Sequence, residues 1–522
     1  MPLMQISYGV EQYLPGAVRQ GTRRATRRLC ALTSALASLA RGEQVSIQGV
    51  TDIVTALVAE FATNGVPADR AALWAETING AKAELDLPEC INDLYLSGYQ
   101  VDAMRTLGKA GGIIALDTGL GKTLAVSAAA IGYAKHGYNK RLFIFAPVNA
   151  TGAWKPYLRK LEQHFGEVCV VSIDSLHKLN GLESEPGGVL IVDECHLTAN
   201  ENSGRTKDAH KLRRCFDVAM CLTGTLTTSS VEHGITTLDL AVPGAALFSS
   251  LWTAGDYFKC LVHKDVGIGR LVTEVAKPTG GHFEKFCAYL SRHAVSVKKH
   301  SSIAAEAGIP PQSTDLVTLA KPWRDLESLV VAVARQYMDE NGGEVPHASW
   351  CRAQLRRLGL DAKVEWLHNL ININAEPLVI AAWSKESLAM LRTLPFLESH
   401  VYVDGGVTGK DRQAAVEAFQ TGKVRFYIGQ VDASCVSVDL FRASTSVLVE
   451  STNRPANYEQ FLGRTARRGQ TRPCMHYDLV SNRYQDKLVR TVKAGRDFDA
   501  SVAENLLINT ILRRNSVVAS RP

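Results

Sequence analysis

The sequence predicts an α/β protein with two lobes, each built on a parallel β-sheet, together with a helical N-terminal region and a partly helical insertion between the lobes. Short, continuously apolar runs alternate with helical segments between residues 110 and 230, and the same alternation returns between residues 361 and 480. Such runs are typical of strands that are buried on both faces, as in parallel sheets covered by helices. The length of 522 residues agrees with this, because domains of roughly 150 residues each give about three domains.

Nine apolar runs are predicted to be the strands of these two sheets. In the first lobe they are Gly112 to Leu116, Leu142 to Ala146, Val168 to Ile173, Val189 to Val192 and Ala219 to Leu222. In the second lobe they are Leu378 to Ala382, Arg425 to Ile428, Ser446 to Val449 and His476 to Leu479. Helices are predicted over Leu124 to Ala134, over Leu326 to Met338 and around the basic trio Arg352, Arg356 and Arg357.

The predicted domain boundaries follow these changes of pattern. They give a helical N-terminal region (1–90), a first lobe (91–231), a linking region with helices (232–360), a second lobe (361–480) and a helical C-terminal tail (481–522). In the N-terminal region, apolar residues recur at helical spacing from Val50 to Phe61, and the stripe ends at Asn64-Gly65. Packing against the next domain is the expected use of this stripe.

Composition excludes several classes of protein. Apolar residues make up 46% and charged residues 21%, which excludes a wholly disordered, collagenous or coiled-coil chain. No apolar run approaches the ~18 residues that a membrane-spanning helix needs, and the first residues do not read as a secretion signal. The eleven cysteines include no CxxC pair, so neither a zinc ribbon nor a redox dithiol is indicated. We expect no membrane partner and an intracellular location.

Charge gives only a local indication of a polyanionic partner. The formal net charge of +6 is too small for this length to indicate nucleic acid by itself. Residues 12–42 contain no Asp or Glu but six arginines. This segment and the trio Arg352, Arg356 and Arg357 are candidates for phosphate contacts, and a solvated helix face is the alternative for each. For the N-terminal segment, an organelle transit peptide is a further alternative.

The strongest motif is the segment Leu116 to Thr123, which follows a predicted strand and opens a predicted helix. This is the context of a phosphate-binding loop, in which Gly119 and Gly121 let backbone N–H groups close around phosphates at a helix N-terminus. Lys122 would reach the β- and γ-phosphates, and the Thr123 hydroxyl would bind Mg²⁺. The first glycine of the strict pattern is replaced by Leu116, and a purely structural turn is the alternative.

Two carboxylates follow the strand Val189 to Val192 directly. Asp193 and Glu194 therefore lie at the carboxyl edge of the predicted sheet, where ligands of open α/β sheets bind. Asp193 is expected to hold Mg²⁺, and Glu194 to orient and deprotonate the attacking water. The alternative is an acidic pair that ends a strand in an exposed turn.

In this order the motifs resemble those of superfamily-two helicases and ATPases, and in detail the Swi/Snf-type (DEAD/DEAH-like) branch. The resemblance covers Leu96 to Gln470 and implies two RecA-like lobes that hydrolyse ATP between them, with Mg²⁺ as cofactor. It makes Gln100 the candidate that binds adenine and compares Phe145-Ala146-Pro147 with Trp154 to motif Ia. It also assigns coupling between the nucleotide and the track to His196, Thr223 and Thr225.

The same resemblance assigns the second half of the site. The segment Gln460 to Arg467 has the form Q-x-x-G-R-x-x-R, in which Arg464 and Arg467 are the candidate catalytic arginines and Gln460 a coupling residue. Asp439 falls at the position of a nucleotide-binding Asn or Asp in motif V, but the Gly-rich part of that motif is absent. A solvent-facing arginine helix is the alternative.

The resulting prediction is an ATP-driven motor on nucleic acid, either a DNA helicase or a duplex-DNA translocase. An RNA helicase is the alternative within the same class, and a nucleotide-gated clamp without productive cycling is the alternative outside it. DNA is the first expected partner and RNA the second, and residues 1–90 could recruit a protein. A cytoplasmic, nucleoid or nuclear location fits each of these, as does a virus inside its host cell.

Overall fold

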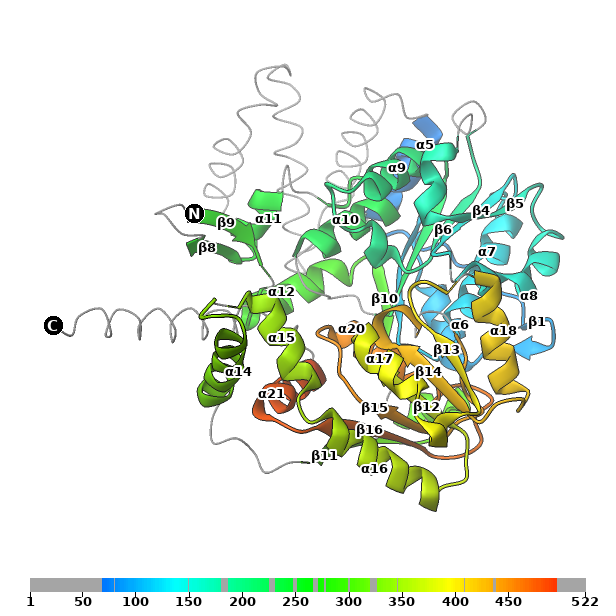
Figure 1. The fold of residues 1–522 in the computed structure, drawn as a ribbon. Helices are drawn as coiled ribbons and strands as arrows, with labels where there is room; N and C mark the ends of the chain where they lie inside the picture. The colour runs from blue at the N-terminus through cyan, green and yellow to red at the C-terminus, as the bar shows by residue number, and fades with distance from the viewer. Residues whose placement is uncertain are drawn as a thin grey trace. The chain divides into compact units, whose positions relative to one another are not determined.

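The computed structural model describes residues 68–78, 80–148, 150–179, 186–224, 231–246, 251–265, 271–276, 278–298, 301–319, 326–344, 346–407, 409–434 and 438–494. The chain divides into two compact units, residues 1–117 with 121–299 and residues 118–120 with 300–522. Each unit holds one six-stranded sheet (Figure 1). The helical stripe predicted from Val50 to Phe61 and the arginine-rich segment before it lie outside the described residues.

All strands of the first sheet run parallel, in the order β10-β3-β7-β6-β4-β5. Their bounds are β3 (Gly111–Leu116), β4 (Leu142–Ala146), β5 (Val168–Ser172), β6 (Val189–Val192), β7 (Val218–Thr223) and β10 (Ala294–Val297). Every residue of β3, β4, β6 and β7 is buried, as the continuous apolar runs predict. The five strands predicted in this lobe are confirmed, with ends that differ by one residue at most.

Helices and short turns connect these strands. They are α5 (Ala68–Ile78), α6 (Gly98–Arg105), α7 (Lys122–Lys135), α8 (Thr151–Leu161), η1 (Ile173–Lys178), η2 (Cys195–Thr198), α9 (Gly204–Arg213), α10 (Val231–Ala241), α11 (Leu251–Tyr257) and α12 (Gly281–Leu290). Two antiparallel hairpins complete the unit, β1 (Cys90–Ile91) with β2 (Leu94–Tyr95) and β8 (Leu261–Asp265) with β9 (Leu271–Val275). Helix α7 is rich in alanine, the best helix former, and nearly all of its residues are buried.

Strand β10 comes from the predicted linking region but belongs to the first sheet. It pairs with β3 from Ala294↔Ile113 to Val297↔Leu116, and the amide of Asp117 donates to the carbonyl of Val297 over 3.2 Å. In the structure, the elements from α10 to β10 therefore lie in the first unit, and those after residue 300 lie in the second.

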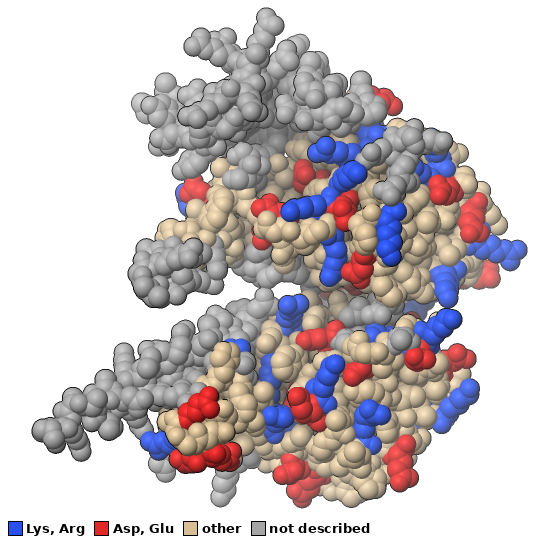
Figure 2. All heavy atoms as spheres, turned by 45° about the horizontal axis from the view of Figure 1, so that its top comes forward, with Lys and Arg blue, Asp and Glu red and all other residues tan. Residues whose placement is uncertain are grey.

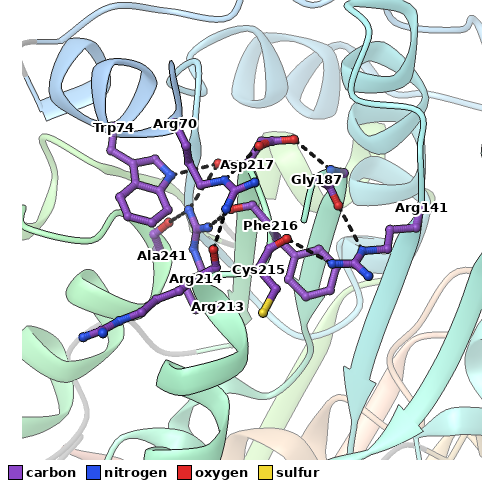
Figure 3. A network of polar contacts seen from close by, with 11 residues as sticks. Arg70, Trp74, Arg141, Gly187, Arg213, Arg214, Cys215, Phe216, Asp217 and Ala241 are labelled. Carbon is purple, nitrogen blue, oxygen red and sulfur yellow. Dashed lines mark hydrogen bonds and ion pairs between the residues drawn. The ribbon is translucent and has the colours of Figure 1, made fainter. Parts of the chain in front are cut away.

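Helix α5 is anchored to the amino end of β7 by buried polar contacts (Figure 3). The guanidinium of Arg70 pairs with Asp217 over 2.9 Å, and the indole N–H of Trp74 donates to the Asp217 carbonyl over 3.0 Å. Fully buried Arg213 donates to the carbonyl of Phe216 over 2.6 Å, and burial lowers its pKa to about 9. The arginines thus satisfy carbonyls that burial would otherwise leave without partners.

The second sheet is also parallel throughout, in the order β11-β16-β15-β12-β14-β13. Its strands are β11 (Gln312–Thr318), β12 (Leu378–Ala382), β13 (His400–Val403), β14 (Phe426–Gln430), β15 (Thr445–Leu448) and β16 (Cys474–Val480). The four strands predicted in this lobe are confirmed, and the predicted fold class with its two parallel-sheet lobes is confirmed with them. Strand β13 was not predicted, because its four residues include a histidine and a tyrosine and do not form a continuous apolar run.

Helices cover both faces of this sheet, and each face has its own apolar cluster. They are α13 (Ser301–Glu306), α14 (Leu326–Glu340), α15 (Ala348–Arg357), α16 (Leu360–Ile373), α17 (Lys385–Arg392), η3 (Pro395–Leu397), α18 (Gly409–Gln420), α19 (Val431–Ser434), α20 (Pro455–Leu462) and α21 (Arg483–Lys493). In the part of the chain that the structure describes, no helix combines the length and the apolar character that a membrane span requires.

Candidate functional site

The connection between β3 and α7 has the backbone of a phosphate-binding loop. Gly119 and Gly121 have φ angles of 93° and 69°, which side chains with a Cβ atom rarely adopt. A Cβ on Gly121 would also lie 2.6 Å from the Nε2 of Gln100. The Nζ of Lys122 donates to the carbonyl of Leu116 over 2.9 Å, so its side chain reaches back across the loop to the end of β3.

Gln100 is a buried link between α6 and this loop. Its Oε1 accepts from the backbone N–H of Ser97 over 3.0 Å, which caps the start of α6. Its Nε2 lies 3.3 Å from the carbonyl of Gly121 and donates to it. Only 2% of the residue is exposed, so it contacts the loop from the protein interior. Adenine binding by Gln100 stays a prediction.

Asp193 follows β6 and is held in place from several sides. Its backbone N–H donates to the carbonyl of Phe145 over 2.7 Å, and its Oδ1 accepts from the backbone N–H of Glu194 over 2.9 Å. The indole N–H of Trp154 on α8 donates to Oδ2 over 3.1 Å. Burial and the neighbouring Glu194 raise the pKa of Asp193, while the Trp154 bond and the positive charge of Lys122 lower it. Lys122 and Asp193, two of the predicted residues, therefore lie near enough for the charge of Lys122 to act on the Asp193 carboxylate.

Glu194 has a φ angle of 48°, one of the few positive values at a residue other than glycine among those described. Such a left-handed conformation costs on the order of 1 kcal/mol and is often found at functional sites. Its Oε2 lies 3.3 Å from the Nδ1 of His196 in η2. The turn after β6 thus places the predicted base beside the histidine to which coupling was assigned.

The strand order explains why these residues share one edge. Strand β7 lies between β3 and β6, and all three run parallel, so their carboxyl ends come together. Thr223 ends β7, is buried, and pairs with Ala115 of β3. Thr225, the other threonine assigned to coupling, lies outside the described residues.

Protein side chains alone would not fill the coordination sphere of a magnesium ion at this edge, so water and phosphate oxygens would have to complete it. Among the described residues, no group of three or more His, Cys, Asp or Glu side chains could hold a metal ion. Asp193 and Thr123 supply a carboxylate and a hydroxyl, the oxygen ligands that Mg²⁺ prefers, and Mg²⁺ commonly takes its other positions from water and phosphate. The buried Asp193 carboxylate, whose pKa is raised, would be stabilised by a cation there.

The second unit holds the two candidate arginines in different surroundings. Arg464 is 2% exposed and its Nη1 donates to the carbonyl of Val438 over 3.3 Å. Arg467 is partly exposed; its Nε donates to the carbonyl of Gly463 over 2.9 Å, and its Nη1 forms an ion pair with Asp439. Of the two, Arg467 is therefore the one whose side chain reaches the surface of its unit.

The other predicted residues of this unit are Asp439 and Gln460. Asp439, assigned to nucleotide binding, follows the partly described motif V segment, and its carboxylate pairs with Arg467. Gln460 lies in α20 and is half-buried. Their roles with ATP and the track stay predictions, as do those of Arg464 and Arg467.

Arg356 is a correction to the sequence interpretation. The basic trio around it was interpreted either as a phosphate contact or as a solvated helix face. In the structure Arg356 is 4% exposed, its Nη1 donates to the carbonyl of Ser451 over 2.7 Å, and its guanidinium lies 4.0 Å from the ring centroid of Trp383. Neither interpretation holds for Arg356, because its guanidinium is buried, donates to a loop carbonyl and stacks on an aromatic ring.

Comparison with known proteins adds evidence for the second unit above all. Residues 362–469 match the model of the helicase conserved C-terminal domain. The Protein CHROMATIN REMODELING 4 of Arabidopsis thaliana is 24% identical over 366 residues, which cover 64% of this chain but only 15% of that protein. The Sulfolobus solfataricus SWI2/SNF2 ATPase core in complex with dsDNA covers 81% of this chain and 95% of its own, at 16% identity and a TM-score of 0.38. That score is too low to support an argument.

The family match spans β12 to α20 and the arginines after it, which is the part where the sequence departs most from the expected motif V. The predicted resemblance to superfamily-two helicases of the Swi/Snf type is therefore confirmed.

Proposed function

We propose that this chain, whose residues 362–469 form a helicase C-terminal domain, is an ATP-hydrolysing motor that moves along duplex DNA. The observation that carries this proposal is that Lys122, Asp193 and Glu194 lie at the carboxyl edge of the first sheet. Nucleoside triphosphatases bind their substrate with these groups: a loop with two left-handed glycines, a lysine and a buried carboxylate. The match to the helicase C-terminal domain is the reason to propose nucleic acid as the track.

The residues of the first unit have distinct tasks in hydrolysis. Backbone N–H groups at the start of α7 would hold the phosphates, and Lys122 would leave the Leu116 carbonyl to bind the β- and γ-phosphates. Thr123 and Asp193 would hold Mg²⁺, which neutralises charge that develops on the phosphates. Glu194 would orient the attacking water and accept its proton, with His196 Nδ1 3.3 Å from its carboxylate.

The arginines of the second unit would take part in hydrolysis, as the family resemblance implies. Arg467 can exchange its ion pair with Asp439 for the γ-phosphate, because its planar guanidinium engages two oxygens at once. Arg464 is buried and would act by holding the segment that carries Asp439, since it donates to the carbonyl of Val438.

Duplex DNA is the track that we propose, because the order of the motifs resembles that of the Swi/Snf-type branch. The chain spans only about 15% of the length of the Arabidopsis protein, so that protein's own activity is not transferred directly. On the face that Figure 2 shows, basic side chains stand among acidic ones over the described surface of both units. We therefore expect phosphate contacts from the motif loops rather than from one broad basic surface, with sequence-independent binding that weakens as salt rises. A DNA track would place the protein in the nucleus or nucleoid.

The polymer dependence of ATP hydrolysis tests the proposal. Steady-state rates would be measured with Mg²⁺ and with no polymer, single-stranded DNA, duplex DNA or RNA, and with Lys122→Ala as the inactive control. We expect duplex DNA to stimulate the wild type most. Stimulation by RNA alone would favour an RNA helicase, and hydrolysis that no polymer stimulates would favour a nucleotide-gated clamp. A strand-displacement assay then separates unwinding from translocation.

A further inference from the structure

One carboxylate in the second unit joins four structural elements. Asp432 follows β14 in the short helix α19, and three side chains donate to its oxygens. The donors are Trp383 Nε1 over 3.0 Å, Thr452 Oγ1 over 2.8 Å and Asn457 Nδ2 over 2.7 Å. Trp383 follows β12, Thr452 follows β15, and Asn457 lies in α20. The carboxyl ends of three neighbouring strands are therefore tied to one another and to α20.

The tryptophan in this cluster is fixed from two other directions. The guanidinium of Arg356 stacks on its ring, as described above, and Gln430 Nε2 donates to its carbonyl over 3.1 Å. The indole N–H is thus aimed at Asp432 by contacts that do not depend on Asp432.

Helix α20 depends on such contacts for its position. It has eight residues, and a helix of that length is not stable without tertiary contacts. Two consecutive residues hold it: Asn457 bonds to Asp432, and the Tyr458 hydroxyl donates to buried Asp478 over 2.6 Å. Arg464 and Arg467 follow directly after its end, so a change in its orientation would move both arginines.

We propose that Asp432 is a positioning residue that holds α20, and with it the two arginines, to the ends of strands β12, β14 and β15. The inference rests on the proposed function, because it assigns Asp432 a task in ATP hydrolysis through Arg464 and Arg467. It also links the carboxyl ends of β12 and β14 to the segment that carries the two arginines. A change at that edge is therefore transmitted to the arginines through one carboxylate.

A carboxylate matches the donors around this position. In the structure all three partners donate, and a carboxylate accepts from all three. In Asp432→Asn the new amide keeps one oxygen for Thr452 and Asn457 but turns its NH₂ group toward the indole N–H of Trp383. Two donors then face each other, so the side chain must rotate and release at least one partner.

The test compares Asp432→Asn with the matched control Asp404→Asn. Asp404 follows β13 at the same edge and accepts from the Tyr402 hydroxyl over 3.0 Å and the Gly406 N–H over 2.8 Å, and neither of these donors belongs to α20. We expect Asp432→Asn to lower kcat for ATP hydrolysis on the order of tenfold, with an unchanged KM for ATP and an unchanged melting temperature. Asp404→Asn should leave kcat unchanged. Equal kcat values for Asp432→Asn and the wild type, or equal losses in both variants, would overturn the inference.

Two further measurements separate positioning from loss of structure. The double variant Asp432→Asn with Trp383→Phe removes the opposing N–H, so it should recover most of the lost kcat; a further loss would contradict the proposal. Hydrogen exchange of the amides in residues 455–462 should be faster in Asp432→Asn and unchanged in Asp404→Asn. This readout needs no activity, so a wild type that does not hydrolyse ATP would refute the proposed function while unchanged exchange in Asp432→Asn would refute the positioning role.

Discussion

The indole N–H of Trp154 and the carboxylate of Asp193 form a buried hydrogen bond, with 3.1 Å between Nε1 and Oδ2. Trp154 comes from α8, which follows β4, and Asp193 follows β6, which pairs with β4 in the sheet. The bond lowers the pKa of Asp193 against the effect of burial. Burial still leaves the pKa of Asp193 raised, so the main effect of the bond is to orient the carboxylate that we propose as a magnesium ligand.

Trp154→Phe should weaken Mg²⁺ binding, because it removes the hydrogen bond to Asp193. Phenylalanine fills most of the same buried space, so the fold should persist, while Asp193 loses its orienting donor. We expect the Mg²⁺ concentration for half-maximal ATP hydrolysis to rise on the order of tenfold. The control is Trp366→Phe, because Trp366 packs edge-on against Tyr477 in the second unit at 5.1 Å between centroids. An unchanged Mg²⁺ dependence in Trp154→Phe would show that the bond is purely structural.

Lys122→Ala and Glu194→Gln should fail at different steps. Loss of the lysine removes a charge that binds the triphosphate, so affinity for a fluorescent ATP analogue should fall. Glu194→Gln keeps the shape of the side chain but cannot accept a proton, so nucleotide binding should persist while kcat falls at least on the order of 10²-fold. Measuring binding and turnover on the same preparations distinguishes them. Normal turnover by Glu194→Gln would remove Glu194 from the role of base.

Arg467→Ala and Asp439→Asn test the ion pair in the second unit. Loss of the guanidinium should lower kcat on the order of 10³-fold with little change in ATP affinity, because its charge is needed in the transition state. Asp439→Asn should instead raise KM for ATP if Asp439 binds the nucleotide. Arg472→Ala, which removes an arginine that pairs with Glu376, is the control and should not change the rate. An unchanged rate in Arg467→Ala would move the catalytic role to another arginine.

Buried Lys363 predicts a pH-dependent stability. Its Nζ donates to the carbonyl of Val449 over 2.6 Å, and burial lowers its pKa to about 8. The unfolded chain keeps this proton up to a pH of about 10.4, so between these values the unfolded state binds more protons and stability rises with pH. From pH 8 to 9.5 the wild type should gain about 1 kcal/mol per unit relative to Lys363→Met, measured by urea unfolding. A constant difference between the two proteins would contradict this.

Asp217→Asn should loosen the attachment of α5. It weakens the ion pair with Arg70 and the bond that the Gly188 N–H donates to the Asp217 carboxylate over 2.8 Å. Because Arg70 is buried, we expect a loss of about 2 kcal/mol in unfolding free energy and faster hydrogen exchange in residues 68–78. Asp86→Asn breaks an exposed pair with Lys135 and should leave the urea midpoint unchanged. Equal effects in the two variants would show that burial of Arg70 does not matter.

Local patterns in the sequence predict much of the fold and the first half of the site. Nine strands were predicted because continuous apolar runs are buried on both faces, and the loop of Gly119 and Gly121 was predicted because its glycines are next to a strand and a helix. The motifs also placed Lys122 and Asp193 at one edge, where the positive charge of Lys122 acts on the Asp193 carboxylate.

What the sequence could not predict depends on contacts between distant residues. Trp154 was recognised as part of a motif, but its bond to Asp193 spans 39 positions. Arg356 was interpreted from its basic neighbours, whereas its partners Ser451 and Trp383 come from other elements. The contacts of Asp432 could not be predicted for the same reason, because a single Asp after a strand does not indicate that three donors bind it.

The position of β10 in the chain, about 70 residues after β7, affects how the first unit folds during synthesis. Strand β3, which leads into the phosphate-binding loop, has β10 as its neighbour on one side, and β10 ends at Val297. A ribosome must therefore translate well past that residue before all six strands of the first sheet can pair. A truncated fragment that stops at the end of β7 would carry a bare, fully apolar edge strand and would tend to aggregate. Expression of this unit alone should therefore extend to residue 298.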